Sequence, residues 1–322
     1  MLAFTIRRAL WTAVVLFTIT ILTYLIFFAT PGVDPARQMA GRNPDPATIK
    51  AIRHEFGLDR PLPVQYGLLM KHMLVSRDLI SYTTRSEVVP QIKAATPVTL
   101  SLVIGAAVIW VVLSIAAGMA AAIFKGTVID PILMIVALIG ISMPVFWLGE
   151  MANLITQSRL HDTFLFSWVP PLGYVPLTEN PLEWLKHLII PWLTLSVLYV
   201  GFYARVLRAN LLEIQNEDYI RTARAKGISE RRVLLRHALR NSLITFVSLF
   251  GLDFGFLVGG GALLTEVVFG LPGVGFVTYQ SLVNFDLPVI MTTVVYGAFF
   301  IVLANALVDV GYAWLDPRIR PA

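Results

Sequence analysis

The sequence predicts an all-α, polytopic membrane protein with six transmembrane helices and both termini in the cytoplasm. Of the 322 residues, 57% are hydrophobic and only 14% are charged, whereas an ordinary soluble domain has roughly 25% charged residues. The apolar residues are gathered into six runs of membrane-spanning length, and lysine and arginine gather at particular ends of these runs. The composition therefore excludes an ordinary soluble domain.

Six segments meet the length of about 20 mostly apolar residues that a bilayer span needs. The first of them follows Arg7 and Arg8 and is longer than the apolar part of a cleaved signal peptide, so residues 1–29 are expected to form a retained signal-anchor helix. The predicted spans are residues 9–29, 97–124, 131–155, 188–206, 243–268 and 287–308.

The orientation follows from the positions of lysine and arginine near the span ends. Arg7 and Arg8 place the N-terminus in the cytoplasm, and six crossings return Arg318 and Arg320 to the same side. The segment between spans four and five is then cytoplasmic. Residues 30–96 are expected to be external although they hold nine lysines and arginines, because loops longer than about 60 residues are largely exempt from the rule.

The external segment, residues 30–96, is the one candidate for a separate subdomain, and residues 97–322 form the membrane core. Two helices are expected in the external segment, at residues 46–56, ending at Gly57, and at residues 61–74. A unit of fewer than 70 residues buries little core by itself. We therefore expect it to pack on the spans or on a partner.

The stretch EDYIRTARAKGISERRVLLRHALRNS, residues 217–242, is basic and helix-prone, unlike the apolar chain around it. Residues 213–226 predict a helix with acidic residues early and basic residues late, an order that suits the helix dipole. Gly227 suits a left-handed position after the helix, and Ser229 suits the cap of a second helix. The pattern predicts two short helices joined by a glycine turn.

Two interpretations of this stretch remain open from the residues alone. It can be a basic hairpin that lies on anionic lipid. It can also be a rigid attachment, through which a cytoplasmic partner moves the two spans that flank it. The glycine turn and the acidic pair Glu217 and Asp218 are not needed for lipid binding and favour the second interpretation.

The same stretch resembles the cytoplasmic coupling loop, or EAA motif, of ABC importer permeases, in the form usual in the dipeptide, oligopeptide and nickel subfamily. The generic pattern E-A-A-x3-G-x9-I-x-L-P is matched by Ala223, Gly227 and Leu239. The residues that depart from it are Arg221, Thr222, His237 and Arg240. Four further stretches are similar to the B-type permease of that subfamily: GLDRPLPVQY, ISMPVFWLG, TEVVFGLPGVG and LDPRIR.

The resemblance implies a type I ABC importer permease fold in a bacterial or archaeal cytoplasmic (inner) membrane, with a coupling loop at about residues 208–242. It implies a heterodimer with a second permease, two cytoplasmic ATPase subunits, an extracytoplasmic peptide-binding protein and surrounding membrane lipid. The implied ATPase-coupling residues are Glu217, Asp218, Tyr219, Arg221, Thr222, Ala223, Arg224, Ala225, Lys226, Gly227, His237 and Leu239.

The chain itself is expected to be no enzyme and to bind no cofactor. It has no Gly-Lys dipeptide, so it lacks the phosphate loop of an ATPase. ATP and Mg²⁺ are therefore expected on the partner ATPase subunits. No metal is expected, because the five histidines lack ligand spacing and there is no cysteine. No nucleic-acid partner is expected, because the basic block lies between membrane-length apolar runs.

Two acidic residues fall within predicted spans, where charges are costly and often functional. Asp253 is expected either to line the translocation path, where it would favour cationic groups, or to be paired with a partner chain or held protonated. Glu150 is the second candidate for the path, or else a residue of the membrane boundary.

The resemblance implies that the chain is a permease subunit of an ATP-driven importer of di- or oligopeptides and forms the translocation path with the second permease. Three alternatives stay open. The same fold can import nickel or glutathione-like solutes. A secondary transporter would need internal topology repeats, and the sequence shows none. An intramembrane enzyme would need a catalytic pair, for which Asp253 has no obvious counterpart.

Overall fold

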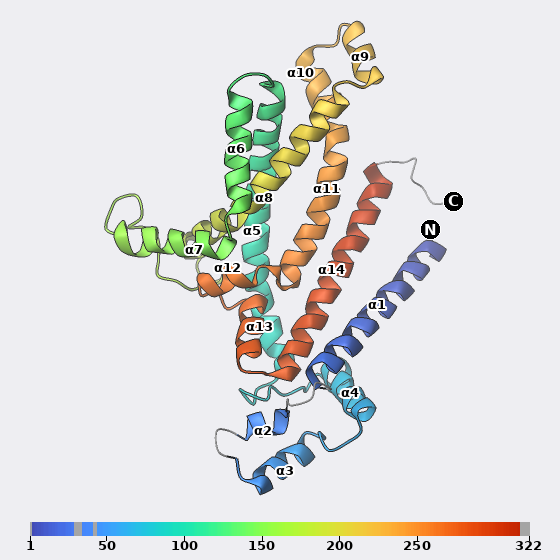
Figure 1. Ribbon diagram of the computed structural model, residues 1–322, viewed down its shortest axis with the longest axis vertical. Helices are drawn as coiled ribbons and strands as arrows, with labels where there is room; N and C mark the ends of the chain where they lie inside the picture. Colours follow the sequence, from blue (N-terminus) through green and yellow to red (C-terminus); the bar gives the residue numbers. More distant parts are fainter. Residues whose placement is uncertain (1, 29–33, 41–43, 316–322) are drawn as a thin grey trace.

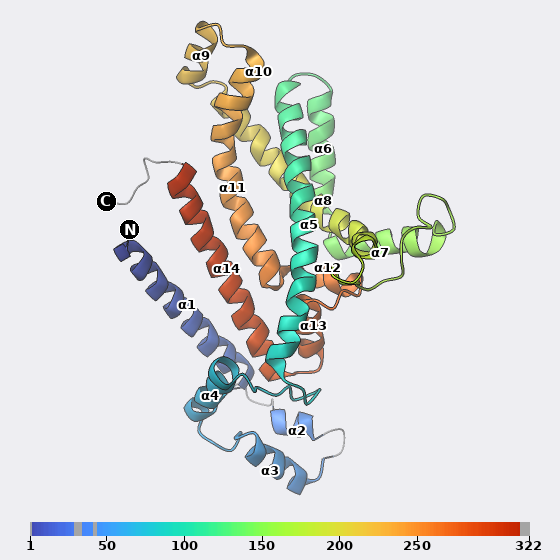
Figure 2. The same ribbon diagram turned by 180° about the vertical axis from the view of Figure 1, so that it is seen from behind.

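A computed structural model describes residues 2–28, 34–40 and 44–315, and within them the chain is helical with no strand. The nearest thing to a sheet in this part of the chain is an isolated antiparallel bridge between Ile80 and Glu87. Long helices run side by side along the molecule. The short helices of residues 218–232 lie at one end, and the predicted external segment, which we call the outer segment, lies at the other (Figures 1 and 2). The all-α prediction is confirmed. Arg318, Arg320 and most of the LDPRIR motif lie outside the described residues.

The elements include four π-helical segments, labelled η. In chain order they are α1 (Leu2–Phe28), α2 (Pro35–Met39), α3 (Pro46–Glu55), α4 (Leu62–Met70), η1 (Lys71–Ser76), α5 (Val88–Ile123), α6 (Ile129–Ser142), α7 (Val145–Asn153), η2 (Leu154–Arg159), α8 (Pro181–Ile214), α9 (Asp218–Ala225), α10 (Glu230–Arg232), η3 (Val233–Ala238), α11 (Leu239–Phe256), η4 (Leu257–Gly261), α12 (Leu263–Val268), α13 (Val274–Val283) and α14 (Leu287–Leu315).

Five of the predicted spans correspond to helices that are long and apolar enough to cross a membrane. They are α1, α5, α8, the continuous helix from Glu230 to Gly261, and α14. With the bent pair α6–α7 counted as one span, the number is six. The prediction of a polytopic membrane protein is confirmed.

The third predicted span, residues 131–155, is not continuous, and this prediction was wrong. The α6 and α7 helices are bent by 93°, and α7 lies across the bundle (Figure 1). Met143 at the bend is extended, with φ −88° and ψ 126°. The cause is Pro144, since proline lacks an N–H and disfavours the helical conformation of the preceding residue.

The fifth predicted span, residues 243–268, was also wrong at its end. The helix stops at Gly261, because Gly260 has a φ of 116° that breaks the helical path. The chain then continues as α12, which runs in another direction (Figure 1). The glycines at 259–261 allow both a bend, at Gly260, and a close helix approach, at Gly259.

The α5 and α8 helices pack closely along their length and hold the main core. The indole Nε1 of Trp192 donates a 2.9 Å hydrogen bond to the carbonyl oxygen of Ser101, and Ser196 Oγ donates a 3.1 Å bond to that of Ala106. The fully buried side chains of Trp110 and Tyr203 fill the space that these helices share with α11. The two helices therefore form one rigid unit.

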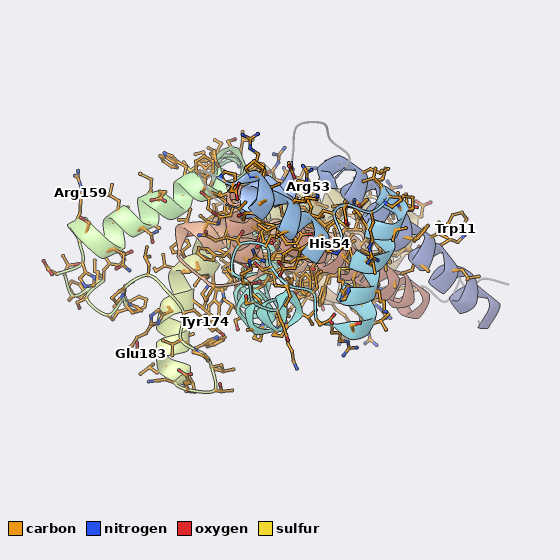
Figure 3. All side chains as sticks on the ribbon, turned by 90° about the horizontal axis from the view of Figure 1, so that it is seen from below. Trp11, Arg53, His54, Arg159, Tyr174 and Glu183 are labelled. Carbon is orange, nitrogen blue, oxygen red and sulfur yellow. The ribbon has the colours of Figure 1, made fainter. Side chains whose placement is uncertain are left out.

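The outer segment packs on the spans, as expected. Its helices α3 and α4–η1 confirm the two predicted ones, and Gly57, which follows the C-cap of α3, has a φ of 64°. Gln65 and Tyr66 form hydrogen bonds with Tyr24 and Thr20 of α1, at 3.2 and 2.7 Å. In the view from below, Arg53 and His54 mark the outer face of α3, and Arg159 and Glu183 lie on the arm formed by η2 and the start of α8 (Figure 3).

The α14 helix meets η4 through backbone contacts at two glycines. A Cβ atom added to Gly297 would overlap the carbonyl oxygen of Gly259, and one added to Gly259 would meet the backbone of Gly297. Backbone atoms cannot turn away as a flexible side chain can. Gly297 is therefore required for α14 to lie against η4.

We predict that Gly297→Ala lowers the thermal stability of the detergent-solubilised protein. Overpacking costs about 1–3 kcal/mol, which exceeds the gain of up to about 1 kcal/mol in helix propensity. The matched control is Gly67→Ala in α4, where an added Cβ has no neighbour within 4 Å. Equal melting temperatures for the two variants would contradict the close approach.

Candidate functional site

The candidate site is the segment that joins α8 to α11, residues 215–238, which we call the elbow. It contains α9, α10 and η3 and stands at one end of the molecule (Figures 1 and 2). The predicted helix at 213–226 is interrupted at residues 215–217, so α9 begins only at Asp218. At this break Asn216 Nδ2 donates a 3.0 Å hydrogen bond to the carbonyl oxygen of Leu212. Such side-chain hydrogen bonds compete with the backbone hydrogen bonds of the helix.

Gly227 forms the predicted left-handed turn. Its φ is 74°, its amide donates to the carbonyl of Arg224 at 2.9 Å, and the amide of Ile228 donates to that of Ala223 at 3.3 Å. This pair of bonds is the Schellman motif that ends many helices. A Cβ at position 227 would find open space, so glycine is needed there for its backbone conformation alone.

Ser229 begins the second arm, as predicted, although by its backbone rather than its hydroxyl. Its carbonyl oxygen accepts hydrogen bonds from the amides of Arg232 and Val233 at 2.8 and 3.0 Å. The side chain makes no capping bond. The second arm then runs without a break through η3 into α11.

One face of the elbow is buried against the long helices. Ile220 is fully buried, as is Ala238, and Val233 is 1% exposed. These side chains join the core cluster that contains Leu207 and Leu211 of α8. The elbow is therefore packed as part of the bundle and is not a free loop. Ile220 was not among the predicted site residues, although its spacing of three from Ala223 is the signal of a shared helix face.

Polar contacts connect the two arms of the elbow and tie them to the bundle. The guanidinium group of Arg224 donates to both carboxylate oxygens of Glu230, at 2.8 and 3.3 Å, across the turn at Gly227. Asn241 Nδ2 of α11 donates to the hydroxyl of Tyr219 at 2.8 Å. Exposed ion pairs contribute only about 0–1 kcal/mol, so the apolar face supplies most of the attachment.

The predicted coupling residues divide between the two faces. Ala223 is buried, and His237 and Leu239 are partly buried. Within α9, Asp218 and Arg221 form a 3.4 Å ion pair on the exposed face. The exposed residues are Glu217, Asp218, Tyr219, Arg221, Thr222, Arg224, Ala225, Lys226 and Gly227. The elbow thus presents a surface of mixed charge, which suits a protein partner.

The two acidic residues predicted for the path lie on different elements. Asp253 is partly buried on α11 and accepts a 2.6 Å hydrogen bond from the hydroxyl of Tyr203 on α8. Glu150 is exposed on α7, the helix that lies across the bundle. Within the described ranges, no group of three or more histidine, aspartate or glutamate side chains is placed to hold a metal ion.

Two family models match the chain. Residues 111–321 match the inner membrane component of binding-protein-dependent transport systems, and residues 1–103 match the N-terminal part of that membrane component. Together they leave only a few residues of the chain unmatched.

Relatives of similar length are found in several bacteria. A Brucella abortus (strain 2308) protein whose name assigns it to a peptide transport system as a permease is 37% identical over 320 residues, 99% of each chain. The dipeptide transport system permease protein of Alkalihalophilus pseudofirmus is 34% identical, with 99% of this chain and 100% of that one covered. The glutathione transport system permease protein of Escherichia coli K12 is 36% identical, with 99% of each covered.

The family, the helical fold and the spans agree with one another. The number of apolar helices and the family description both indicate a multi-pass protein of the inner membrane. The chain therefore belongs to the family of binding-protein-dependent transport system inner membrane components, the ABC importer permeases of the type I fold.

Proposed function

We propose that this ABC importer permease is one of two permease subunits that form the translocation path for di- or oligopeptides, and that the elbow receives the movement of a cytoplasmic ATPase. The elbow carries the proposal: its charged face is exposed, and its apolar face is packed into the two long helices that it joins. A partner that grips the exposed face would move α8 and α11 directly.

The energy has to come from a partner. The chain contains no Gly-Lys dipeptide and hence no phosphate loop. We propose that ATP and Mg²⁺ are held by two cytoplasmic ATPase subunits, each seated on the elbow of one permease. Closure of the ATPases on ATP would then open the path to the outside, where a binding protein releases the solute.

The contacts of α8 suggest how movement at the elbow would spread. This helix has 34 residues, which corresponds to about 51 Å. Near its elbow end, Arg208 donates two 2.6 Å hydrogen bonds to the carboxylate of Asp130 in α6. Farther along, Trp192 and Ser196 bond to α5. A push on the elbow would therefore move α5, α6 and α8 together.

The peptide substrate is inferred from the names of the relatives. Two of those described above are named for peptide or dipeptide transport. Glutathione is the second candidate, because a relative with 36% identity is named for it. Asp253 and Glu150 remain proposed residues of the path.

Uptake by the reconstituted complex tests the proposal. The chain, a second permease, the ATPases and the binding protein would be placed in proteoliposomes with ATP inside, and entry of a labelled dipeptide, tetrapeptide and glutathione would be measured. ATP-dependent entry of the dipeptide or tetrapeptide supports peptide import. Entry of glutathione alone would favour the second candidate. Uptake by the chain without ATPases would overturn the proposed coupling.

We predict that Gly227→Val uncouples uptake while the protein still inserts into the membrane. A left-handed backbone costs an L-residue about 1–2 kcal/mol, and about 1.4 kcal/mol corresponds to a tenfold change in binding. Uptake and ATPase co-purification should therefore fall by about tenfold.

The matched control for Gly227→Val is Gly126→Val. Gly126 lies between α5 and α6 at the same end of the molecule, with a φ of 83° and open space at its Cβ. The Gly126→Val substitution should leave uptake unchanged, because Gly126 lies outside the elbow. If both variants lost uptake equally, the effect would come from backbone strain and not from the elbow.

We predict that Ile220→Asp detaches α9 from the bundle. An aspartate at a fully buried apolar position leaves a charge without a partner, which is strongly unfavourable. Limited proteolysis of membranes from the cytoplasmic side should then cut within residues 215–230 at least about tenfold faster, since each 1.4 kcal/mol of lost packing raises the opened fraction tenfold. Ala225→Asp, at an exposed position of the same helix, should leave cleavage unchanged.

A further inference from the structure

Asp253 is a carboxylate near the middle of a membrane-spanning helix. It lies 14 residues after the start of α11 and eight before the end of η4. A charge at such depth is costly unless it faces the interior of the bundle, a water-filled path or a partner of opposite charge. Its partners therefore decide what it does.

Among the described residues, Asp253 has one side-chain hydrogen-bond partner. The hydroxyl of Tyr203 donates a 2.6 Å hydrogen bond to its Oδ2 atom, and its Oδ1 atom accepts none among the described residues. No lysine, arginine or histidine in the described ranges forms an ion pair with it. The Oδ1 atom of the carboxylate is therefore available for a donor other than the described residues.

Aromatic residues lie close to this position in the sequence of both helices, and the fully buried Trp110 packs against two of them, Tyr199 and Phe250, with ring centroids 4.6 and 5.6 Å apart. On α8, Tyr199 lies one turn before Tyr203, with 6.4 Å between the ring centroids. On α11, Phe250 and Phe254 flank Asp253 in the sequence and stack at 5.6 Å. The rings of Tyr199, Phe250 and Phe254 are only partly buried. Aromatic faces attract cations, and they recognise ammonium groups most strongly where water is excluded.

The neighbours of α11 show on which side of the helix the Asp253 carboxylate lies. The α8 and α11 helices leave the elbow together and diverge along the molecule (Figures 1 and 2). Tyr203 bridges them at the level of Asp253. The opposite side of α11 is taken by α14, which contacts Gly251 and Gly255. The carboxylate thus lies on the side of α11 that faces α8 and away from α14.

We propose that Asp253, together with the rings of Tyr199, Phe250 and Phe254, forms a subsite for a protonated amino group of the transported peptide. Tyr203 holds the carboxylate in place through Oδ2, and Oδ1 accepts a hydrogen bond from the ammonium group. The inference rests on the proposed function, because it requires that the path between the two permeases passes this side of α11.

The test compares a lysine-containing tripeptide with its glutamate-containing counterpart in proteoliposomes that hold the full complex. The ratio of their initial uptake rates cancels effects common to both peptides. In Asp253→Asn the ratio should fall by about tenfold, which corresponds to about 1.4 kcal/mol. Asp253→Glu, which keeps the charge, should retain most of the preference.

A second readout does not depend on peptide import. Butylammonium should protect the solubilised permease pair from thermal unfolding, and Asp253→Asn should abolish this protection. An unchanged uptake ratio in Asp253→Asn, or equal protection of wild type and variant, would overturn the subsite. The subsite would also be overturned if Asp253→Asn lowered the uptake of both peptides equally and made the permease pair less stable. Asp253 would then be paired with a cation of the second permease.

The two proposals can fail separately. If the wild-type complex imported no peptide but butylammonium still protected it through Asp253, the proposed function would fail and the subsite would stand. If peptides were imported with the same lysine-to-glutamate ratio in wild type and Asp253→Asn, the function would stand and the subsite would fail.

Discussion

The packing of α8 against α5 is the contact on which the rest of the structure depends. It is tight because small residues let the two helices approach: an added Cβ on Gly105 would overlap the indole of Trp192, and one on Gly118 would meet the carbonyl of Ala204. The same helix carries Tyr203, which reaches α11, and Arg208, which reaches α6. The elbow follows directly after the end of α8. One helix therefore connects the exposed surface of the elbow with the core of the bundle.

A second constraint comes from the bilayer, where every backbone polar group has to be satisfied within the protein. The two breaks in the spanning helices, at Pro144 and Gly260, both lead into short helices that pack on each other. Asn153 Nδ2 of α7 donates a 3.0 Å bond to the carbonyl oxygen of Val268, the last residue of α12. The crosswise layer of α7 and α12 thus satisfies a backbone carbonyl at the end of α12.

The comparison of sequence and structure shows which features are local. The left-handed turn at Gly227 was predictable because glycine is the residue type that fits this conformation best. The α3 helix was predictable because a proline precedes it and a glycine follows it. The bend at Pro144 has a local cause but was missed, because the apolar run continues through it. A hydropathy profile says how apolar a segment is but not in which direction its helix runs. The bond from Tyr203 to Asp253 joins residues 50 apart, so it depends on how α8 and α11 pack, which no local pattern contains.

The two ends of the molecule use their charges differently. At the outer end, Glu266 is fully buried and accepts hydrogen bonds from Thr99 Oγ1 at 2.6 Å and from the amide of Phe276 at 2.8 Å. Asp286 is 3% exposed and accepts bonds from the amides of Tyr82 and Thr83 at 3.0 and 3.2 Å.

These two carboxylates connect neighbouring elements of the chain through hydrogen bonds. Glu266 holds the turn before α13 against α5, and Asp286 holds the outer segment against the start of α14. At the elbow, by contrast, Asp218, Arg221 and Glu230 are exposed and pair weakly with neighbours. This arrangement agrees with the proposed coupling at the elbow, because a force applied to the elbow would act on a bundle that is held together at its far end.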